Sequence, residues 1–134
     1  MTAQNTELIQ RAYDAFSRGD HATIFEIFGQ DITWHVPGSS PLSGDYKGHD
    51  QVRAFFAATM DLSDGTFRID NQDILAQQDQ VVVLCTVTAE RHGRSWSTPE
   101  VHIWRVADQQ AVDFREFQGD QQAEDEFWSS PAPR

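Results

Sequence analysis

The spacing of the apolar residues changes near residue 66, and this change constrains the fold more than any other feature of the sequence. Before residue 66, apolar residues recur at helical spacing; after it, they alternate with polar residues over four successive stretches. Alternation is typical of strands with one buried face, and the later stretches are joined by short turns, so we expect an antiparallel meander. Helices followed by strands predict an α+β fold whose helices pack on one face of the sheet.

About three N-terminal helices are predicted ahead of the strands. Residues 5–17 carry an apolar stripe at helical spacing, and Asp20 caps a second helix whose apolar residues extend to Phe28. A third helix is predicted at about residues 50–60. The remaining predicted elements are a strand at 31–36, a Gly-, Ser- and Pro-rich loop at 38–44, strands at 67–76, 80–90, 95–106 and 112–118, and a short helix at 120–128.

Length and charge limit the domain count and the partners. A chain of 134 residues fits one domain, which we place at residues 1–128 with a frayed tail at 129–134. The formal net charge of −11 repels phosphate backbones and anionic membrane surfaces, so we expect no nucleic-acid or membrane partner. There is no signal-peptide pattern and only one cysteine, Cys85, so we expect a cytoplasmic protein without an internal disulfide.

The last predicted hairpin carries the candidate chemistry. Its strands flank a five-residue connection, and pairing symmetric about Gln109 places residues that sum to 218 opposite one another. Directly opposed residues have Cβ atoms about 4.5–5.5 Å apart, close enough for an imidazole–carboxylate hydrogen bond. The opposed pairs on one sheet face are Val106 with Val112, Trp104 with Phe114, and His102 with Glu116.

A His102–Glu116 pair among apolar side chains would titrate unusually. The carboxylate raises the pKa of the His, while burial raises the pKa of the Glu, and either effect gives a group that moves protons near neutral pH. The alternative interpretation is a structural cross-strand hydrogen bond. A turn at His92-Gly93 in the preceding hairpin places Val83 beside His102, and Glu100 on the same face nearer the rim of the sheet.

Outside the last hairpin, the sequence offers few further candidates for a functional role. Tyr13 lies on the helix predicted to cover the pocket and can donate a phenolic hydrogen bond, although a core aromatic is the alternative. The five His residues show no zinc-site spacing, so we expect no metal. The sequence has no phosphate loop, dinucleotide fingerprint or nucleophile elbow, so we expect no cofactor. Cys85 is interpreted as a small buried apolar group.

Several segments resemble one known family. The stretch from Trp34 to Gly48, the segment 15–20, the segment 114–117 and the segment 125–128 resemble the SnoaL-like branch of the nuclear transport factor 2-like superfamily, over almost the whole chain. This resemblance implies a cone-shaped α+β barrel: about three helices on a strongly curved, mainly antiparallel sheet, with a pocket inside. It also implies a homodimer through the outer face of the sheet.

The resemblance implies roles for individual residues. Polyketide cyclases of this branch use a His and an Asp that fall on His102 and Glu116. Epoxide hydrolases of the superfamily place a water-activating Asp at the position of Glu116, so Glu replaces Asp here. The general base of ketosteroid isomerase falls on Val36 and its oxyanion Tyr on Ala12, so steroid isomerisation by that mechanism is not expected.

The sequence thus supports two hypotheses about function. The first is a cofactor-independent enzyme acting on a small apolar carbonyl or epoxide compound, with Glu116 as general base, His102 orienting it and Tyr13 donating to oxyanion charge. The second is a non-catalytic protein that binds a hydrophobic ligand or uses the fold for assembly. If aromatic side chains fill the pocket, no cavity should exist. The residues expected to line the pocket are Trp34, Val36, Phe55, Val83, Trp104 and Phe114.

Overall fold

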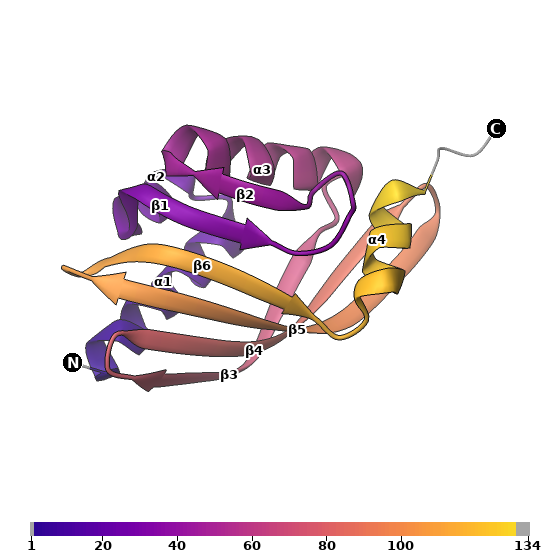
Figure 1. The fold of residues 1–134 in the computed structure, drawn as a ribbon. Coiled ribbons are helices and arrows are strands. Elements are labelled where there is room, and N and C mark those ends of the chain that lie inside the picture. The colour runs from indigo at the N-terminus through magenta and orange to yellow at the C-terminus, as the bar shows by residue number, and fades with distance from the viewer. Residues whose placement is uncertain (1, 131–134) are drawn as a thin grey trace.

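Four helices and six strands make up the described part of the chain, residues 2–130, in a computed structural model (Figure 1). The helices are α1 (Thr2–Arg18), α2 (His21–Ile27), α3 (Gly48–Leu62) and α4 (Gln121–Ser129). The strands are β1 (Phe28–Val36), β2 (Gly44–Lys47), β3 (Arg68–Gln77), β4 (Gln80–Arg91), β5 (Arg94–Ala107) and β6 (Gln110–Gln118). No helix within residues 2–130 is long and apolar enough to cross a membrane.

The strands form one mixed sheet in the order β2-β1-β6-β5-β4-β3. Only β1 and β6 run parallel; every other neighbouring pair is antiparallel. The predicted α+β class with a curved, mainly antiparallel sheet is confirmed. The sheet is open, with β2 and β3 as its edges. Helices α1, α2 and α3 correspond to the three predicted N-terminal helices, and α4 corresponds to the short helix predicted at 120–128.

Three helices cover the inner face of the sheet, and the core lies between the two layers (Figure 1). Helix α1 packs on β3 and β4 through a stripe that includes the fully buried Ile9 and Ala15, and α3 packs on β1 and β2. Fully burying a side chain of the size of Ile9 stabilises the fold by about 1.5–3 kcal/mol. Helix α4 lies at one end of the sheet, where its Phe127 and Trp128 join a second apolar cluster with Leu42 and Ala89.

The hairpin registers decide which side chains share the inner face. At His92 and Gly93 both φ angles are positive, 53° and 81°, as a two-residue turn of this kind requires. The predicted pairing of Val83 with His102 is confirmed. In the last hairpin the predicted pairing of His102 with Glu116 is also confirmed.

The predicted five-residue connection of that last hairpin is wrong. The chain turns at Asp108 and Gln109, both with positive φ, so Val106 lies opposite Ala111 and not Val112. An irregularity between Arg105 and Val106 then shifts the register by one residue. The shorter turn and the bulge compensate each other, which is why the predicted register holds from Trp104 onward.

Other differences from the predicted elements are local. Strand β2 lies where the loop 38–44 ends, and it pairs with β1 so that Tyr46 lies opposite Trp34. Phe28 adopts extended backbone angles and begins β1 instead of ending the second helix. Helix α4 ends at Ser129, and the Ser130 N–H donates to the Phe127 carbonyl, so two residues of the predicted tail are structured. Residues 131–134 of that tail lie outside the described residues.

Candidate functional site

A cavity lies between the helices and the inner face of the sheet. Its free space is about 70 Å³, and since a buried water needs about 10–15 Å³, it holds several waters or one small ring-sized molecule. The aromatic side chains therefore do not fill the pocket. Of the residues predicted to line the pocket, Trp34, Val36, Phe55, Trp104 and Phe114 do so, together with His102, Glu116 and Tyr13. Val83 is fully buried beside His102 and is not among the lining residues.

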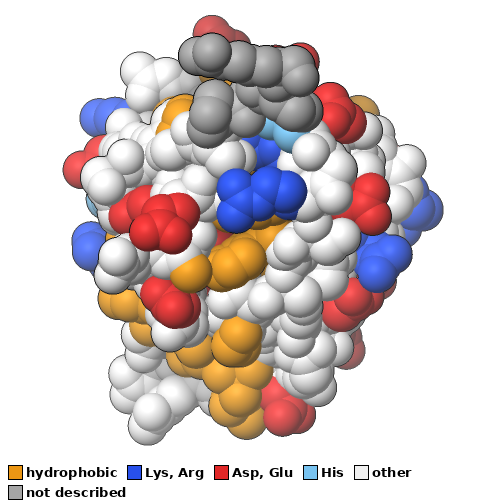
Figure 2. Space-filling view, turned by 90° about the vertical axis from the view of Figure 1, so that its right-hand side faces the viewer, with side chains coloured by type: hydrophobic (Ala, Val, Ile, Leu, Met, Phe, Trp, Pro, Cys, Tyr) orange, Lys and Arg blue, Asp and Glu red, His pale blue; other side chains and the backbone are white. Residues whose placement is uncertain are grey.

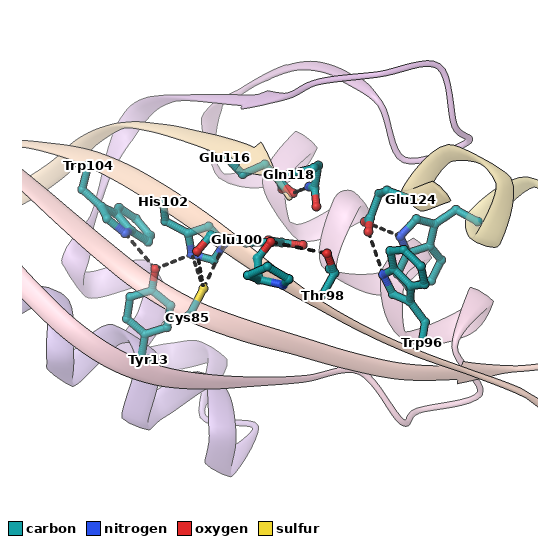
Figure 3. A network of polar contacts seen from close by, with 12 residues as sticks. Tyr13, Cys85, Trp96, Thr98, Glu100, His102, Trp104, Glu116, Gln118 and Glu124 are labelled. Atoms are coloured by element: carbon teal, nitrogen blue, oxygen red, sulfur yellow. Dashed lines mark hydrogen bonds and ion pairs between the residues drawn. The ribbon is translucent and has the colours of Figure 1, made fainter. Parts of the chain in front are cut away.

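Alternation along β5 and β6 places the polar groups of the cavity. Glu100, His102 and Trp104 occupy every second position of β5, and all three are at most 5% exposed. Phe114 and Glu116 likewise occupy every second position of β6; Phe114 is buried and Glu116 is partly buried, and both line the cavity. Figure 3 shows the polar groups in a row that runs from Trp104 and Tyr13, past His102 and Glu100, to Glu124 on α4.

A directed chain of hydrogen bonds fixes the state of His102. The Trp104 indole N–H can only donate, and its acceptor is the Tyr13 hydroxyl oxygen at 2.9 Å. The Tyr13 proton then goes to His102 Nδ1, 2.6 Å away. With Nδ1 accepting, the ring proton lies on Nε2 and is donated to Glu100 Oε1 at 2.8 Å. This is the arrangement in which every proton of the chain has an acceptor, and it makes His102 a neutral imidazole.

The carboxylate partner of His102 is Glu100, and not Glu116 as the sequence predicted. Both ring nitrogens of His102 are occupied, by Tyr13 and by Glu100. Glu116 lies opposite on β6 and accepts a short hydrogen bond of 2.5 Å from Gln118 Nε2. Tyr13, predicted to donate to a ligand, has its proton engaged by His102. Glu100 is also deeply buried, at 5% exposed, and not near the rim.

Burial dominates the electrostatics of the site. It lowers the pKa of His102 to about 4, with Glu116 acting in the opposite direction, so the predicted rise in the pKa of this His is wrong. Burial and then the nearby Glu124 carboxyl raise the pKa of Glu100 to about 8. Burial and then Glu100 raise the pKa of Glu116 well above its usual value. The described lining residues include no Lys or Arg to offset these carboxyls.

A third carboxyl closes the cavity at the α4 end. Glu124 is 7% exposed, and its two oxygens accept hydrogen bonds from the indole N–H groups of Trp128, at 2.6 Å, and Trp96, at 2.8 Å. Burial raises the pKa of Glu124, while these two donors lower it. Seen from the end at which α4 lies, apolar side chains form a band across the surface with charged groups beside it (Figure 2).

The remaining titratable candidates lie away from the cavity or are inert. His35 faces the outer side of the sheet, with Nδ1 2.8 Å from Asp45 and Nε2 3.0 Å from Asp113. Burial raises the pKa of Cys85 to about 12, which fits the prediction that it is a buried apolar group and not a nucleophile. Within residues 2–130 no cluster of His, Cys, Asp or Glu could hold a metal ion.

Sequence reasoning missed Gln118 and Glu124 as members of this site, and it gave Glu100 no role. Parity did place Glu100 on the face of His102, because it lies two residues before His102 on the same strand, but nearer the rim of the sheet than the structure has it. Gln118 has the same relation to Glu116 on β6. Glu124 had no such signal, since its position depends on how α4 docks against β5.

Comparison with known proteins identifies the family. The SnoaL-like domain profile matches residues 9–114. An uncharacterised protein of Mycobacterium tuberculosis, Rv0034, is 32% identical over 124 residues, which cover 92% of this chain and 95% of the relative. Among solved structures, Bal32a from a soil-derived mobile gene cassette is 34% identical with a TM-score of 0.91, covering 95% of this chain and 98% of its own.

A second solved structure was determined with a small molecule. TerC, co-crystallised with polyporic acid, is 26% identical with a TM-score of 0.85, and the match covers 95% of this chain and 99% of TerC. The profile match extends over most of the chain, and the fold agrees with it. The chain therefore belongs to the SnoaL-like family of the nuclear transport factor 2-like superfamily.

Proposed function

We propose that this protein is a cofactor-independent enzyme in which Glu116 acts as general base on a small, mostly apolar carbonyl or epoxide compound. The observation that carries the proposal is the position of Glu116: its carboxyl lines an apolar cavity, and burial raises its pKa. A carboxylate with a raised pKa is a stronger base than an ordinary Glu side chain. The co-crystallisation of TerC with polyporic acid supports a small-molecule ligand for this chain as well.

The same base serves two reactions. With a carbonyl compound, the Glu116 carboxylate takes a proton from the carbon next to the carbonyl; the C–H electron pair forms the enolate double bond, and the carbonyl electrons move to oxygen. The enolate then takes that proton back from Glu116, or it attacks a second carbonyl in the same molecule, whose oxygen takes the proton from Glu116. With an epoxide, the Glu116 carboxylate takes a proton from water as the water oxygen attacks one epoxide carbon; the C–O bond at that carbon breaks, its electron pair stays on oxygen, and this alkoxide takes the proton from Glu116 to give a diol.

His102 and Tyr13 are positioning residues in this proposal. His102 lies directly across from Glu116 as a neutral group, held by Tyr13 and Glu100, so no cation is present to weaken the base. The hydrogen-bonded chain fixes the part of the cavity wall that lies beside the carboxyl on the same sheet face. A misplacement of about 1 Å in such a wall can reduce the rate by about a hundredfold.

The test compares wild-type protein with Glu116→Gln, which keeps the side-chain shape and removes the base. Deuterium incorporation into cyclohexanone in D₂O reports C–H proton removal, and diol formation from cyclohexene oxide reports hydrolysis. We expect wild-type protein to catalyse one of them and Glu116→Gln to lose at least about a hundredfold in rate. Glu26→Gln, at an exposed position of α2, is the matched control. Unchanged rates in Glu116→Gln, or two inert probes with wild-type protein, contradict the proposal.

A second candidate function is non-catalytic binding of a small apolar ligand. It is favoured by the hydrogen-bonded chain itself, because every proton from Trp104 to Glu100 is used within the protein, as in a structural network. In that case the wild-type protein and Glu116→Gln bind cyclohexanone with similar affinity, and neither changes it.

We also propose that a second copy of the chain covers the outer face of the sheet. Leu84, Val101 and Phe117 lie side by side across β4, β5 and β6, and Leu84 and Phe117 are 37% and 50% exposed. Exposed apolar side chains in a row favour an interface. Sedimentation should show a dimer that Phe117→Lys converts to monomer; a monomeric wild-type protein at all concentrations contradicts this proposal.

A further inference from the structure

Trp34 carries a buried hydrogen-bond donor without a partner. Its side chain lines the cavity from β1 and is 5% exposed, and its indole Nε1–H has no acceptor among residues 2–130. A buried donor left unpaired costs about 1–3 kcal/mol. Such groups are rare in native proteins, so an unpaired N–H in the lining of a cavity points to an acceptor on a bound molecule.

The surroundings of Trp34 explain why the protein offers no acceptor. Its ring stacks on Phe114 at a centroid distance of 3.8 Å, and it also lies against Phe28, Phe55 and Trp104. Other donors of the lining form hydrogen bonds within the protein. Trp104 donates to Tyr13, and Tyr13 donates to His102. Trp128 donates to Glu124, and Gln118 donates to Glu116. Among the ring N–H groups of the described lining residues, that of Trp34 is the one that a ligand can use without breaking one of these bonds.

Trp34 and Glu116 lie one step apart on the inner face. Trp34 pairs with Phe114 across the parallel β1–β6 ladder, and Glu116 follows Phe114 by two residues. Two residues of a strand span roughly 6.5 Å and neighbouring strands lie about 4.8 Å apart, so the Cα atoms of Trp34 and Glu116 are separated by roughly 8 Å. This separation suits one small ring compound whose oxygen lies at the indole while the carbon next to it faces the carboxyl.

We propose that Trp34 Nε1–H donates to the oxygen of the substrate and stabilises the negative charge that develops there, which makes Trp34 a catalytic residue alongside Glu116. The catalytic half of this inference rests on the function proposed above, whereas the binding half does not. The described lining residues include three carboxyls, and they include no Lys or Arg. An anionic ligand would therefore find no positive charge in the cavity, so the oxygen belongs to an uncharged ketone, ester or epoxide and not to a carboxylate or phosphate.

The experiment uses cyclohexanone and methylenecyclohexane, two rings of similar shape of which only the ketone has an acceptor. The Trp34 indole resonance of ¹⁵N-labelled protein is assigned by its absence in Trp34→Phe. We expect cyclohexanone to shift the Trp34 indole proton downfield, and we expect no such shift with methylenecyclohexane. One net hydrogen bond of about 1 kcal/mol corresponds to about a fivefold change in affinity. Trp34→Phe should therefore bind the ketone about fivefold more weakly and the hydrocarbon within about twofold.

Unchanged indole resonances of Trp96 and Trp128, which lie away from Trp34, show that Trp34→Phe is folded. If the variant is not folded, the shift of the Trp34 proton in wild-type protein decides between the outcomes. The inference is overturned if cyclohexanone binds without moving the Trp34 proton, if Trp34→Phe weakens both compounds equally, or if neither binds. A shift of the Trp34 proton without deuterium incorporation into cyclohexanone supports Trp34 as a donor and contradicts proton removal by Glu116. Failure of this inference can therefore be told apart from failure of the proposed function.

Discussion

Glu100→Gln should make the stability of this protein less sensitive to rising pH. Glu100 is 5% exposed and accepts a hydrogen bond from His102 Nε2. Gln retains an acceptor oxygen of the same reach, so the contact with the neutral imidazole can persist. What the substitution removes is the buried carboxyl, whose pKa is raised to about 8 by burial and by Glu124.

The sign of the effect follows from proton binding. In the unfolded chain this carboxyl has a pKa of about 4.3, so between that value and about 8 the folded protein holds a proton that the unfolded chain has lost. The free energy of unfolding therefore falls as pH rises through this window, by about 1.4 kcal/mol per pH unit. Between about pH 5 and about pH 8, this carboxyl removes up to about 4 kcal/mol, and Gln removes none.

Urea unfolding followed by Trp fluorescence measures this difference. We expect the difference between the free energy of unfolding of Glu100→Gln and that of wild-type protein to increase, in favour of Glu100→Gln, by several kcal/mol from about pH 5 to about pH 8. The titration of His102, whose lowered pKa makes stability rise with pH between about 4 and 6.5, is common to both proteins and cancels. Glu26→Gln should run parallel to wild type. Parallel curves for Glu100→Gln would refute the reasoning.

Two further substitutions test the polar network. Tyr13→Phe leaves the Trp104 N–H and His102 Nδ1 without their Tyr13 partner and should lower the free energy of unfolding by about 2–4 kcal/mol. The control Tyr46→Phe removes one hydrogen bond to the Leu42 carbonyl and should lower it by about 1 kcal/mol. Equal losses in the two variants would argue against the directed chain. Glu124→Ala leaves the indole N–H groups of Trp96 and Trp128 without their acceptor and should expose the α4 segment to limited proteolysis. An unchanged digestion pattern would show that Glu124 does not hold α4 in place.

The sequence was sufficient for the fold and for the faces of the last strands. Strict alternation fixes which side chains share a face, so His102, Trp104, Phe114 and Glu116 were placed correctly even though the turn was predicted with the wrong length. Strand β2 was missed because four residues, two of them Gly44 and Asp45, give too short a pattern to detect.

The hydrogen-bond partner of His102 could not be derived from the sequence. Two carboxyls share its face, Glu100 on the same strand and Glu116 across the ladder, and strand spacing does not decide which side chain reaches the ring. The direction of its pKa shift depends on the depth of burial, which requires the helices and α4 to be in place. The Trp96–Glu124 contact likewise joins segments whose relation only the folded chain defines.

The ionisation of Glu116 inside the cavity is the central claim, and a ¹³C NMR titration of the side-chain carboxyls measures it directly. Glu116→Gln assigns the resonance by its disappearance. The account predicts that the Glu116 carboxyl loses its proton well above the ordinary Glu value of about 4.3, because burial and then the nearby Glu100 carboxyl raise its pKa. A Glu116 carboxyl that titrates near that ordinary value would contradict the account, because the group would then be solvated and no stronger a base than a carboxylate in water.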